Sequence, residues 1–370
     1  MFDFLPEFLR TPVAFAIVLG VLVFIHELGH YLAARWCGVH VETFSIGFGR
    51  ALVSWTDRLG TVWKIAWIPL GGYVKLHGQE RPEDVSEEVR AAWQPGRTFH
   101  EKRVGARAIV VAAGPVANFL LAAVLFSALI AVVGRSIPVP VVGEVVADSA
   151  AARAGLQVGD RIEAIGGTPI RRFEEIQRAV AASPGQALQL TVASGGVSRD
   201  VTVIPDQRDS GGRMIGVLGI RGGATEYERL SPWEAVPAGV AQTWEVAAQT
   251  LDGVWGMIAR NRGTEDIGGP LRIAQLSGQV AELGVASLVS FIALLSVNLG
   301  LINLFPVPVL DGGHLLFYLV EAVLGRPLPQ RAQEVGFRAG LALIVALFVF
   351  ATWNDLGHTG IFRWVAGLIG

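Results

Sequence analysis

Two histidines and a glutamate in one short stretch carry the clearest chemical signal in this sequence. The stretch reads H-E-x-x-H and comprises His26, Glu27 and His30. On a helix, residues four apart share a face, so the two imidazoles can bind one metal ion. Glu27 lies beside the first of them and can act as general base toward a water that the metal activates. The pattern therefore predicts the centre of a zinc hydrolase.

The surroundings of the motif sharpen this prediction. The motif lies inside an apolar run, residues 12–32, and does not follow one. Ionisable groups at membrane depth are costly, and they are rare there unless they have a task. The apolar setting therefore favours a metal site over two histidines whose ring nitrogens are simply satisfied within a helix bundle.

The composition indicates a polytopic membrane protein that carries a soluble part. The chain has 370 residues, of which 52% are hydrophobic and 17% charged, and its mean hydropathy is +0.48. A net charge of −2 gives no reason to expect a nucleic-acid partner. Cys37 is the single cysteine, so an internal disulfide is excluded. The N-terminal apolar segment lacks a basic region before it and carries the metal motif, so we expect no cleavable signal peptide.

Hydropathy and turn signals predict an α-helical membrane protein with about four transmembrane helices, a membrane-associated β-region and an inserted α+β domain. In chain order we predict a first transmembrane segment (1–37), a loop with a membrane-associated β-hairpin or small sheet (38–106), a second transmembrane segment (107–134), the inserted domain (135–206), a linker with amphipathic helices (207–284), and the third and fourth transmembrane segments (285–370).

Two segments beside these helices could shape a substrate site. Residues 41–75 are β-rich and punctuated by glycine and proline, and a sheet edge there could receive an extended peptide. A plain surface meander fits the same pattern. Asn118 lies in the apolar second segment, where a polar side chain must find a partner across the bundle. We expect either a packing role or a place on the wall of a polar cavity that contacts substrate.

A catalytic zinc ion usually has three protein ligands and one open position, so a third ligand is required. Ala33 and Trp36 stand where an extended histidine motif would place its glycine and third histidine. Asp311 is the better candidate, because a carboxylate at the end of a membrane segment can meet the two histidines within a bundle. Prolines and glycines surround it, which is typical of irregular backbone beside a wet cavity. The alternative role for Asp311 is a helix N-cap.

The inserted domain resembles a bacterial PDZ domain, because short strands alternate with a helix around the segment 154–162. This resemblance implies that the turn at Gly155 and Leu156 presents backbone N–H groups to a peptide C-terminus. A role as a size filter is the alternative.

Taken together, the motifs resemble the site-2 protease family, and the PDZ-like insert is similar to its bacterial RseP type. The three motifs are His26-Glu27-x-x-His30, Gly114-Pro115-x-x-Asn118-Phe119 and Asn303-x-x-Pro306-x-Pro308-x-x-Asp311-Gly312. The resemblance implies an intramembrane zinc metalloprotease that cleaves single-pass membrane proteins, such as anti-sigma factors already shortened by another protease, or signal-peptide remnants.

The family's functional residues can be carried over by position. The resemblance implies that His26, His30 and Asp311 bind Zn²⁺ and that Glu27 is the catalytic base. It also implies that Asn303 contacts the substrate or steadies the transition state, and that the β-region guides the substrate strand. The best-known members carry two PDZ domains in tandem, whereas one is found here.

The distribution of Lys and Arg predicts the orientation in a bacterial inner membrane. The loops 38–106 and 311–338 carry more of these residues than the two short tails, which places them and the active site on the cytoplasmic side. Both termini and the PDZ-like domain are then expected outside, in the periplasm.

Two other classes of function fit part of the pattern. A metal-transporting or metal-sensing membrane protein could use the same three ligands, but it would need neither Glu27 nor a PDZ-like insert. An inactive scaffold would have no use for an intact H-E-x-x-H motif.

Overall fold

The computed structural model describes residues 6–80, 85–210, 213–259 and 269–358. By its internal contacts the chain divides into two compact units. The first comprises Met1–Leu129 and Pro232–Gly370, and the second comprises Ile130–Ser231. The end of the last predicted segment, 359–370, lies outside the described residues.

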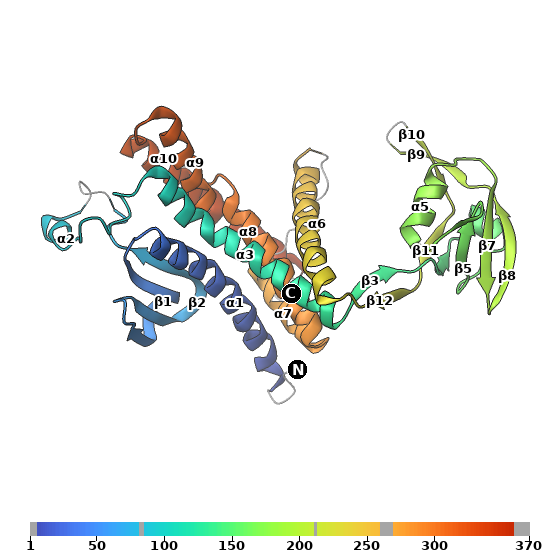
Figure 1. Cartoon of the computed structure of the whole chain (residues 1–370), viewed down its shortest axis with the longest axis horizontal. Helices are drawn as coiled ribbons and strands as arrows, with labels where there is room; N and C mark the ends of the chain where they lie inside the picture. Colours follow the sequence, from blue (N-terminus) through green and yellow to red (C-terminus); the bar gives the residue numbers. More distant parts are fainter. Residues whose placement is uncertain (1–5, 81–84, 211–212, 260–268, 359–370) are drawn as a thin grey trace, which may run out of the picture. The chain divides into compact units, whose positions relative to one another are not determined.

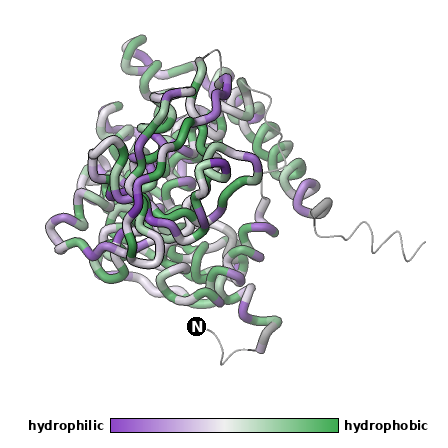
Figure 2. Tube along the Cα trace, turned by 90° about the vertical axis from the view of Figure 1, so that its right-hand side faces the viewer, coloured by the Kyte–Doolittle hydropathy of each residue, from purple (hydrophilic) through white to green (hydrophobic). Residues whose placement is uncertain are grey.

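Four of the described helices are long and apolar enough to cross a membrane, which confirms the predicted number of spans. Long hydrophobic stretches are visible along the trace in Figure 2. In lipid a helix satisfies its own backbone groups, and the prolines inside the first and second spans are tolerated there. The four helices are α1 (Glu7–Trp36), α3 (Val104–Val132), α8 (Val285–Leu304) and α10 (Gln330–His358).

Helices α1 and α3 approach each other closely at the level of the metal motif (Figure 1). A Cβ atom at Gly29 of α1 would overlap the carbonyl oxygen of Ala113 and would lie 2.8 Å from the Cβ of Ala117. Small residues of this kind let membrane helices pack backbone to backbone. Gly29 directly precedes His30, so the close contact brings α3 against the histidine face of α1.

Shorter helices surround the spans. The two predicted amphipathic helices are confirmed as helices. The first packs Val246 and Ala247 against Ala293 and Val297 of α8. The second has its N-terminal N–H groups bound by the buried carboxylate of Asp355 in α10. These and the remaining helices of the first unit are α6 (Pro232–Ala259), α7 (Pro270–Glu282), α2 (Glu87–Ala91) and α9 (Asp311–Leu324).

The predicted β-region is an antiparallel hairpin of β1 (Val41–Thr56) and β2 (Val62–Leu76). The start of β1 is the middle strand of this small sheet. The start of β1 pairs with the beginning of β2 on one side and with the end of β2 on the other. The end of β2, from Gly72 to Leu76, therefore forms one border of the sheet, and α1 packs against β2.

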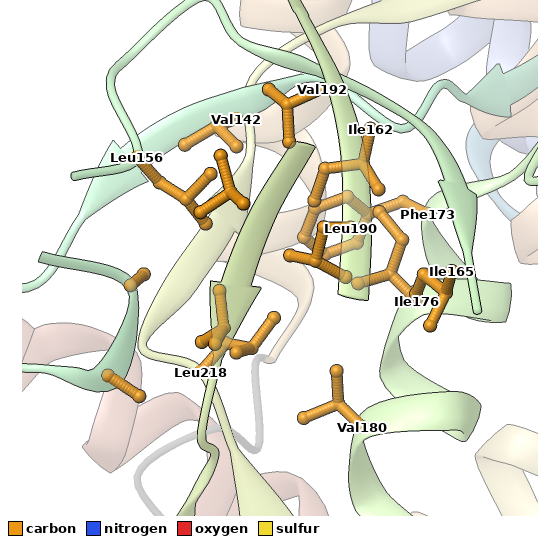
Figure 3. Close-up of a cluster of buried hydrophobic side chains, with 14 residues drawn as sticks. Val142, Leu156, Ile162, Ile165, Phe173, Ile176, Val180, Leu190, Val192 and Leu218 are labelled. Atoms are coloured by element: carbon orange, nitrogen blue, oxygen red, sulfur yellow. The ribbon is translucent and has the colours of Figure 1, made fainter. Parts of the chain in front are cut away.

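The second unit contains a four-stranded antiparallel sheet in the order β6-β5-β7-β8. Figure 3 shows Ile162 and Leu190 of this sheet facing Ile176 and Val180 of α5 across a buried cluster. The predicted strands and helix of the insert are thus present. The elements are α4 (Ala150–Arg153), β5 (Arg161–Ile165), β6 (Thr168–Pro169), α5 (Phe173–Ala181), β7 (Leu188–Ser194) and β8 (Val197–Val203).

The structure moves the predicted end of the insert from residue 206 to Ser231. The segment read as linker forms strands that return to pair with the first two strands of the unit. Residues some 80 positions apart pair in this way, and such pairing leaves no local sequence pattern. The strands are β3 (Arg135–Pro138) with β12 (Thr225–Glu228), β4 (Val142–Val145) with β11 (Ile220–Gly222), and the hairpin of β9 (Asp206–Ser210) and β10 (Arg213–Val217).

Truncating the core of the second unit should destabilise that unit alone. Leu190→Ala removes a side chain with no exposed surface, and we expect a loss of about 2–5 kcal/mol in the free energy of unfolding. Hydrogen exchange of the full chain in detergent measures this loss locally. Val197→Ala on neighbouring β8, where the side chain is 72% exposed, is the matched control. Equal effects of the two substitutions would contradict the core assignment.

Candidate metal centre

Three side chains from two helices meet at one point. His26 and His30 lie one turn apart on α1, and Asp311 is the first residue of α9. The two Nε2 atoms are 3.2 Å apart. Oδ2 of Asp311 is 3.2 Å from Nε2 of His26 and 3.4 Å from Nε2 of His30. Donor atoms at zinc-ligand distance from one tetrahedral ion are separated by about 3.3 Å, so this triangle has the dimensions of a zinc site.

The surroundings leave room for an ion. Gly114 of α3 faces the triangle, and a Cβ atom there would overlap Nε2 of His30 and would lie 2.9 Å from Cε1 of His26. Burial acts to raise the pKa of Asp311, but contacts with the two histidines lower it to about 2. The carboxylate is therefore ionised at neutral pH. Two imidazoles and one carboxylate are also the donor set of several catalytic zinc sites.

Helix α3 provides a hydrogen-bonding partner for the second ring nitrogen of each histidine. Nδ1 of His30 lies 2.9 Å from the carbonyl oxygen of Val110, and Nδ1 of His26 lies 3.1 Å from the carboxamide of Asn118. A metal-binding imidazole commonly donates its second N–H to such a group, which fixes the ring orientation. Both rings thus have one nitrogen toward the centre and one toward α3.

Asp311 is held by close backbone packing around it. Cβ atoms at Gly312 and Gly313 would overlap the carbonyl oxygen of Leu304 at the end of α8 and the backbone of Pro308. The connection between α8 and α9 therefore packs directly on the first turn of α9. The glycines that follow the aspartate in the motif are required for this contact.

Glu27 lies next to His26 and faces the border strand of the β-hairpin. The backbone N–H of Val74 donates a hydrogen bond to its carboxylate. A Cβ atom at Gly72 would lie 3.1 Å from Cγ of Glu27 and 2.7 Å from the carbonyl oxygen of Ser45. The glycine thus lets β2 pass directly over the glutamate.

A cavity of about 820 Å³ opens beside these groups, and His26, Glu27, His30 and Asp311 all line it. Asn303, expected to contact substrate, also lines the cavity. The cavity is large enough for a short peptide segment and the water that hydrolysis consumes.

Several other groups in the cavity wall had no role predicted from the sequence. His314 lies one turn after Asp311 on α9, and its ring contacts Phe337 edge-on at 5.8 Å. Arg107 of α3 pairs with Glu321 of α9 at 2.6 Å and lies over the ring of Tyr318 at 4.9 Å. For His314, Tyr318 and Glu321 the sequence signal was their spacing from Asp311 along one helix, α9. Arg107 lies on α3 and had no such signal.

Two expectations about substrate-binding residues need correction. Asn118 has no exposed surface, and its side chain contacts His26 rather than a cavity wall. Gly155 and Leu156 do not present free N–H groups, because these groups donate to the carbonyl oxygens of Ala152 and Ala151. The turn caps the C-terminus of α4, and the Leu156 side chain is buried in the core. A capped helix end and an open anion nest share the same Gly-containing sequence pattern.

Comparison with known proteins agrees with this geometry. The sequence matches Peptidase family M50 over residues 14–347. The chain belongs to this family. A Rhizobium meliloti protein whose name places it among the zinc metalloproteases is 44% identical, over 94% of this chain and 96% of the relative. The metalloprotease MmpA of Caulobacter vibrioides is 38% identical, over 98% and 99% of the two chains.

The regulator of sigma-E protease RseP of Escherichia coli is 34% identical, over 95% of this chain and 99% of RseP. Their alignment covers 454 positions although this chain has 370 residues, so RseP has additional residues inside the shared span. The M50 protein described here is thus a zinc metalloprotease of the site-2 protease family and a membrane protein. Family membership decides against the alternative of a metal transporter or sensor.

Filling the space beside the histidines should remove the metal. Gly114→Ala places a methyl group on the ligand triangle, and we expect zinc affinity to fall by about tenfold or more. Alanine also favours helix over glycine, so the fold should not be weakened by helix propensity. Zinc per chain, measured by atomic absorption, tests this. Gly105→Ala on the same helix, where a Cβ atom meets nothing within 4 Å, is the control. Full zinc content in Gly114→Ala would contradict the assigned site.

Proposed function

We propose that this M50 protein is an intramembrane endopeptidase in which His26, His30 and Asp311 hold the zinc ion and Glu27 is the general base. The observation that carries the proposal is the triangle of donor atoms with zinc-site dimensions, beside a buried glutamate and a cavity. All of these groups lie on helices that are apolar enough for a membrane or directly follow one.

The chemistry requires a nucleophile and a proton path. Bound zinc supplies a Lewis acid that lowers the pKa of a water to about 7 and polarises the scissile carbonyl. Glu27 takes the proton from the attacking water and passes it to the leaving nitrogen. The Val74 N–H holds the carboxylate in place for both transfers. The Asn303 side chain, in the same cavity, contacts the substrate or steadies the transition state.

A transmembrane substrate has to unwind before it can be cut, because the backbone bonds of a helix hide its carbonyl groups. The border of the β-hairpin at 72–76 runs past Glu27 and supports an extended substrate strand by strand addition. This gives the glycine-punctuated β-region a physical purpose beside the site.

Single-pass membrane proteins are the proposed substrates, either anti-sigma factors already shortened by another protease or signal-peptide remnants. The name of RseP refers to regulation of sigma-E, and the similarity supports the first class. We place the protein in the bacterial inner membrane, with the active site toward the cytoplasm. The second unit is a PDZ-like domain in the periplasm, and it binds a peptide C-terminus or limits substrate size.

Replacing the proposed base, Glu27, should abolish peptide cleavage without affecting zinc binding. Glu27→Gln keeps the size of the side chain but cannot accept the proton, so we expect cleavage of a membrane-anchored reporter to be abolished. Zinc per chain should stay unchanged, because Glu27 is not a proposed ligand. The cleavage rate is measured with the purified variant in proteoliposomes. A rate equal to that of the unsubstituted protein would contradict the proposed role of Glu27.

The position of β2 over Glu27 should also matter for turnover. Gly72→Ala introduces a methyl group 2.8 Å from Cγ1 of Val23 and 2.7 Å from the Ser45 carbonyl oxygen. The border strand must then shift away from α1, and a misplacement of about 1 Å can cost on the order of 10²-fold in rate. We expect kcat/KM to fall on that scale while zinc content stays unchanged. Unchanged kcat/KM would show that the hairpin border has no part in catalysis.

A further inference from the structure

The second ring nitrogen of His26 has an unusual partner for a proposed metal ligand. Asn118 has no exposed surface, and its Nδ2 lies 3.1 Å from Nδ1 of His26. The other half of the carboxamide, Oδ1, is buried and has no hydrogen-bond partner among the described residues.

Metal binding by His26 sets a requirement on this contact. An imidazole that offers Nε2 to a metal carries its proton on Nδ1, and that N–H needs an acceptor. The oxygen and nitrogen of a carboxamide exchange places by a half-turn, and only the hydrogen bonds distinguish the two orientations. After this half-turn, Oδ1 of Asn118 accepts the Nδ1–H of His26, as zinc ligation through Nε2 requires.

His30 meets the same requirement in a different way. Its Nδ1 faces the carbonyl oxygen of Val110, a fixed acceptor on the same helix α3. His26 lies one turn away, where α3 presents the side-chain amide of Asn118 in place of a main-chain carbonyl. The backbone behind that amide is itself anchored, because Oγ of Ser296 in α8 donates to the carbonyl oxygen of Asn118 at 2.8 Å.

We propose that Asn118 is a positioning residue for the metal centre: its side-chain oxygen accepts the Nδ1–H of His26 and keeps Nε2 unprotonated and directed at the ligand triangle. The proposal rests on zinc ligation by His26. It assigns to Asn118 a role in metal affinity rather than in substrate binding, since the side chain does not reach the surface.

Zinc affinity of the purified full chain, measured by competition with a chelator, tests the proposal. Asn118→Leu has a similar shape but no acceptor, and we expect the affinity to fall about 10- to 100-fold. Asn118→Asp keeps acceptor oxygens at the same place and should bind zinc at least as tightly as the unsubstituted chain. Ser127→Ala, which removes a hydroxyl from the same helix at a distance from the histidines, should leave the affinity unchanged.

The spectrum of bound Co²⁺ gives a second readout that packing alone would not change. We expect an altered ligand-field band in Asn118→Leu and a near-native band in Asn118→Asp. Should the leucine variant fail to fold, Asn118→Ala replaces it, with the same expected loss of affinity. Equal loss in the aspartate variant and the variants without an acceptor would overturn the proposal. So would unchanged zinc affinity with a raised KM in Asn118→Leu, which would mark a substrate contact.

The same titration separates this inference from the proposed function. If His26→Ala binds zinc as well as the unsubstituted chain, the ligand set is wrong, and the role of Asn118 falls with it. If His26→Ala loses zinc but Asn118→Leu keeps it, the ligand set stands and only the positioning role is overturned.

Discussion

The close approach of α1 and α3 is the constraint on which the rest of the site depends. Polar side chains at membrane depth cannot rely on water for hydrogen bonds, so another helix has to supply their partners. Glycine on each helix makes this possible: Gly29 lets α3 come near, and Gly114 keeps the space beside the rings free. Helix α3 can then meet both imidazoles with a main-chain and a side-chain group.

Helix α9 and the β-hairpin each bring one further polar group to this helix pair. The start of α9 brings a carboxylate onto the two ring nitrogens. The border of the β-hairpin brings a backbone N–H onto Glu27. The two histidines and Glu27 share helix α1, but α3 orients the proposed ligands and the β-hairpin orients the proposed base. The cavity between these elements leaves space where a peptide carbonyl can approach both.

Much of this arrangement could be predicted from the sequence, because its signals are local or chemically rare. The motif around His26 and His30 carries its own geometry, and a carboxylate near membrane depth such as Asp311 has few reasons to be there. Apolar runs gave the four spans. The partner of Asn118 could not be predicted, since nothing in a helix pattern says which neighbour a buried amide will meet.

Pairing between strands far apart in the sequence could not be predicted either. Strands β11 and β12 cannot be predicted locally, because their partners β4 and β3 lie at the beginning of the same unit. The turn at Gly155 differs from the expectation for another reason, since the sequence does not show whether its N–H groups are already used by a helix end. The ion pair of Arg107 with Glu321 likewise joins residues that only the fold brings together.

The two glycines after Asp311 also limit how the protein can open to admit a substrate. Since the connection from α8 packs directly on the backbone at Gly312 and Gly313, a movement of α8 would carry the start of α9, with the proposed ligand Asp311, along with it. Such a movement would pull the carboxylate away from the histidines. A movement that preserves the donor triangle must therefore spare α1 as well, because α1 carries His26 and His30. The β-hairpin contributes none of the three donor groups, so it is the element beside the cavity that can shift without separating them.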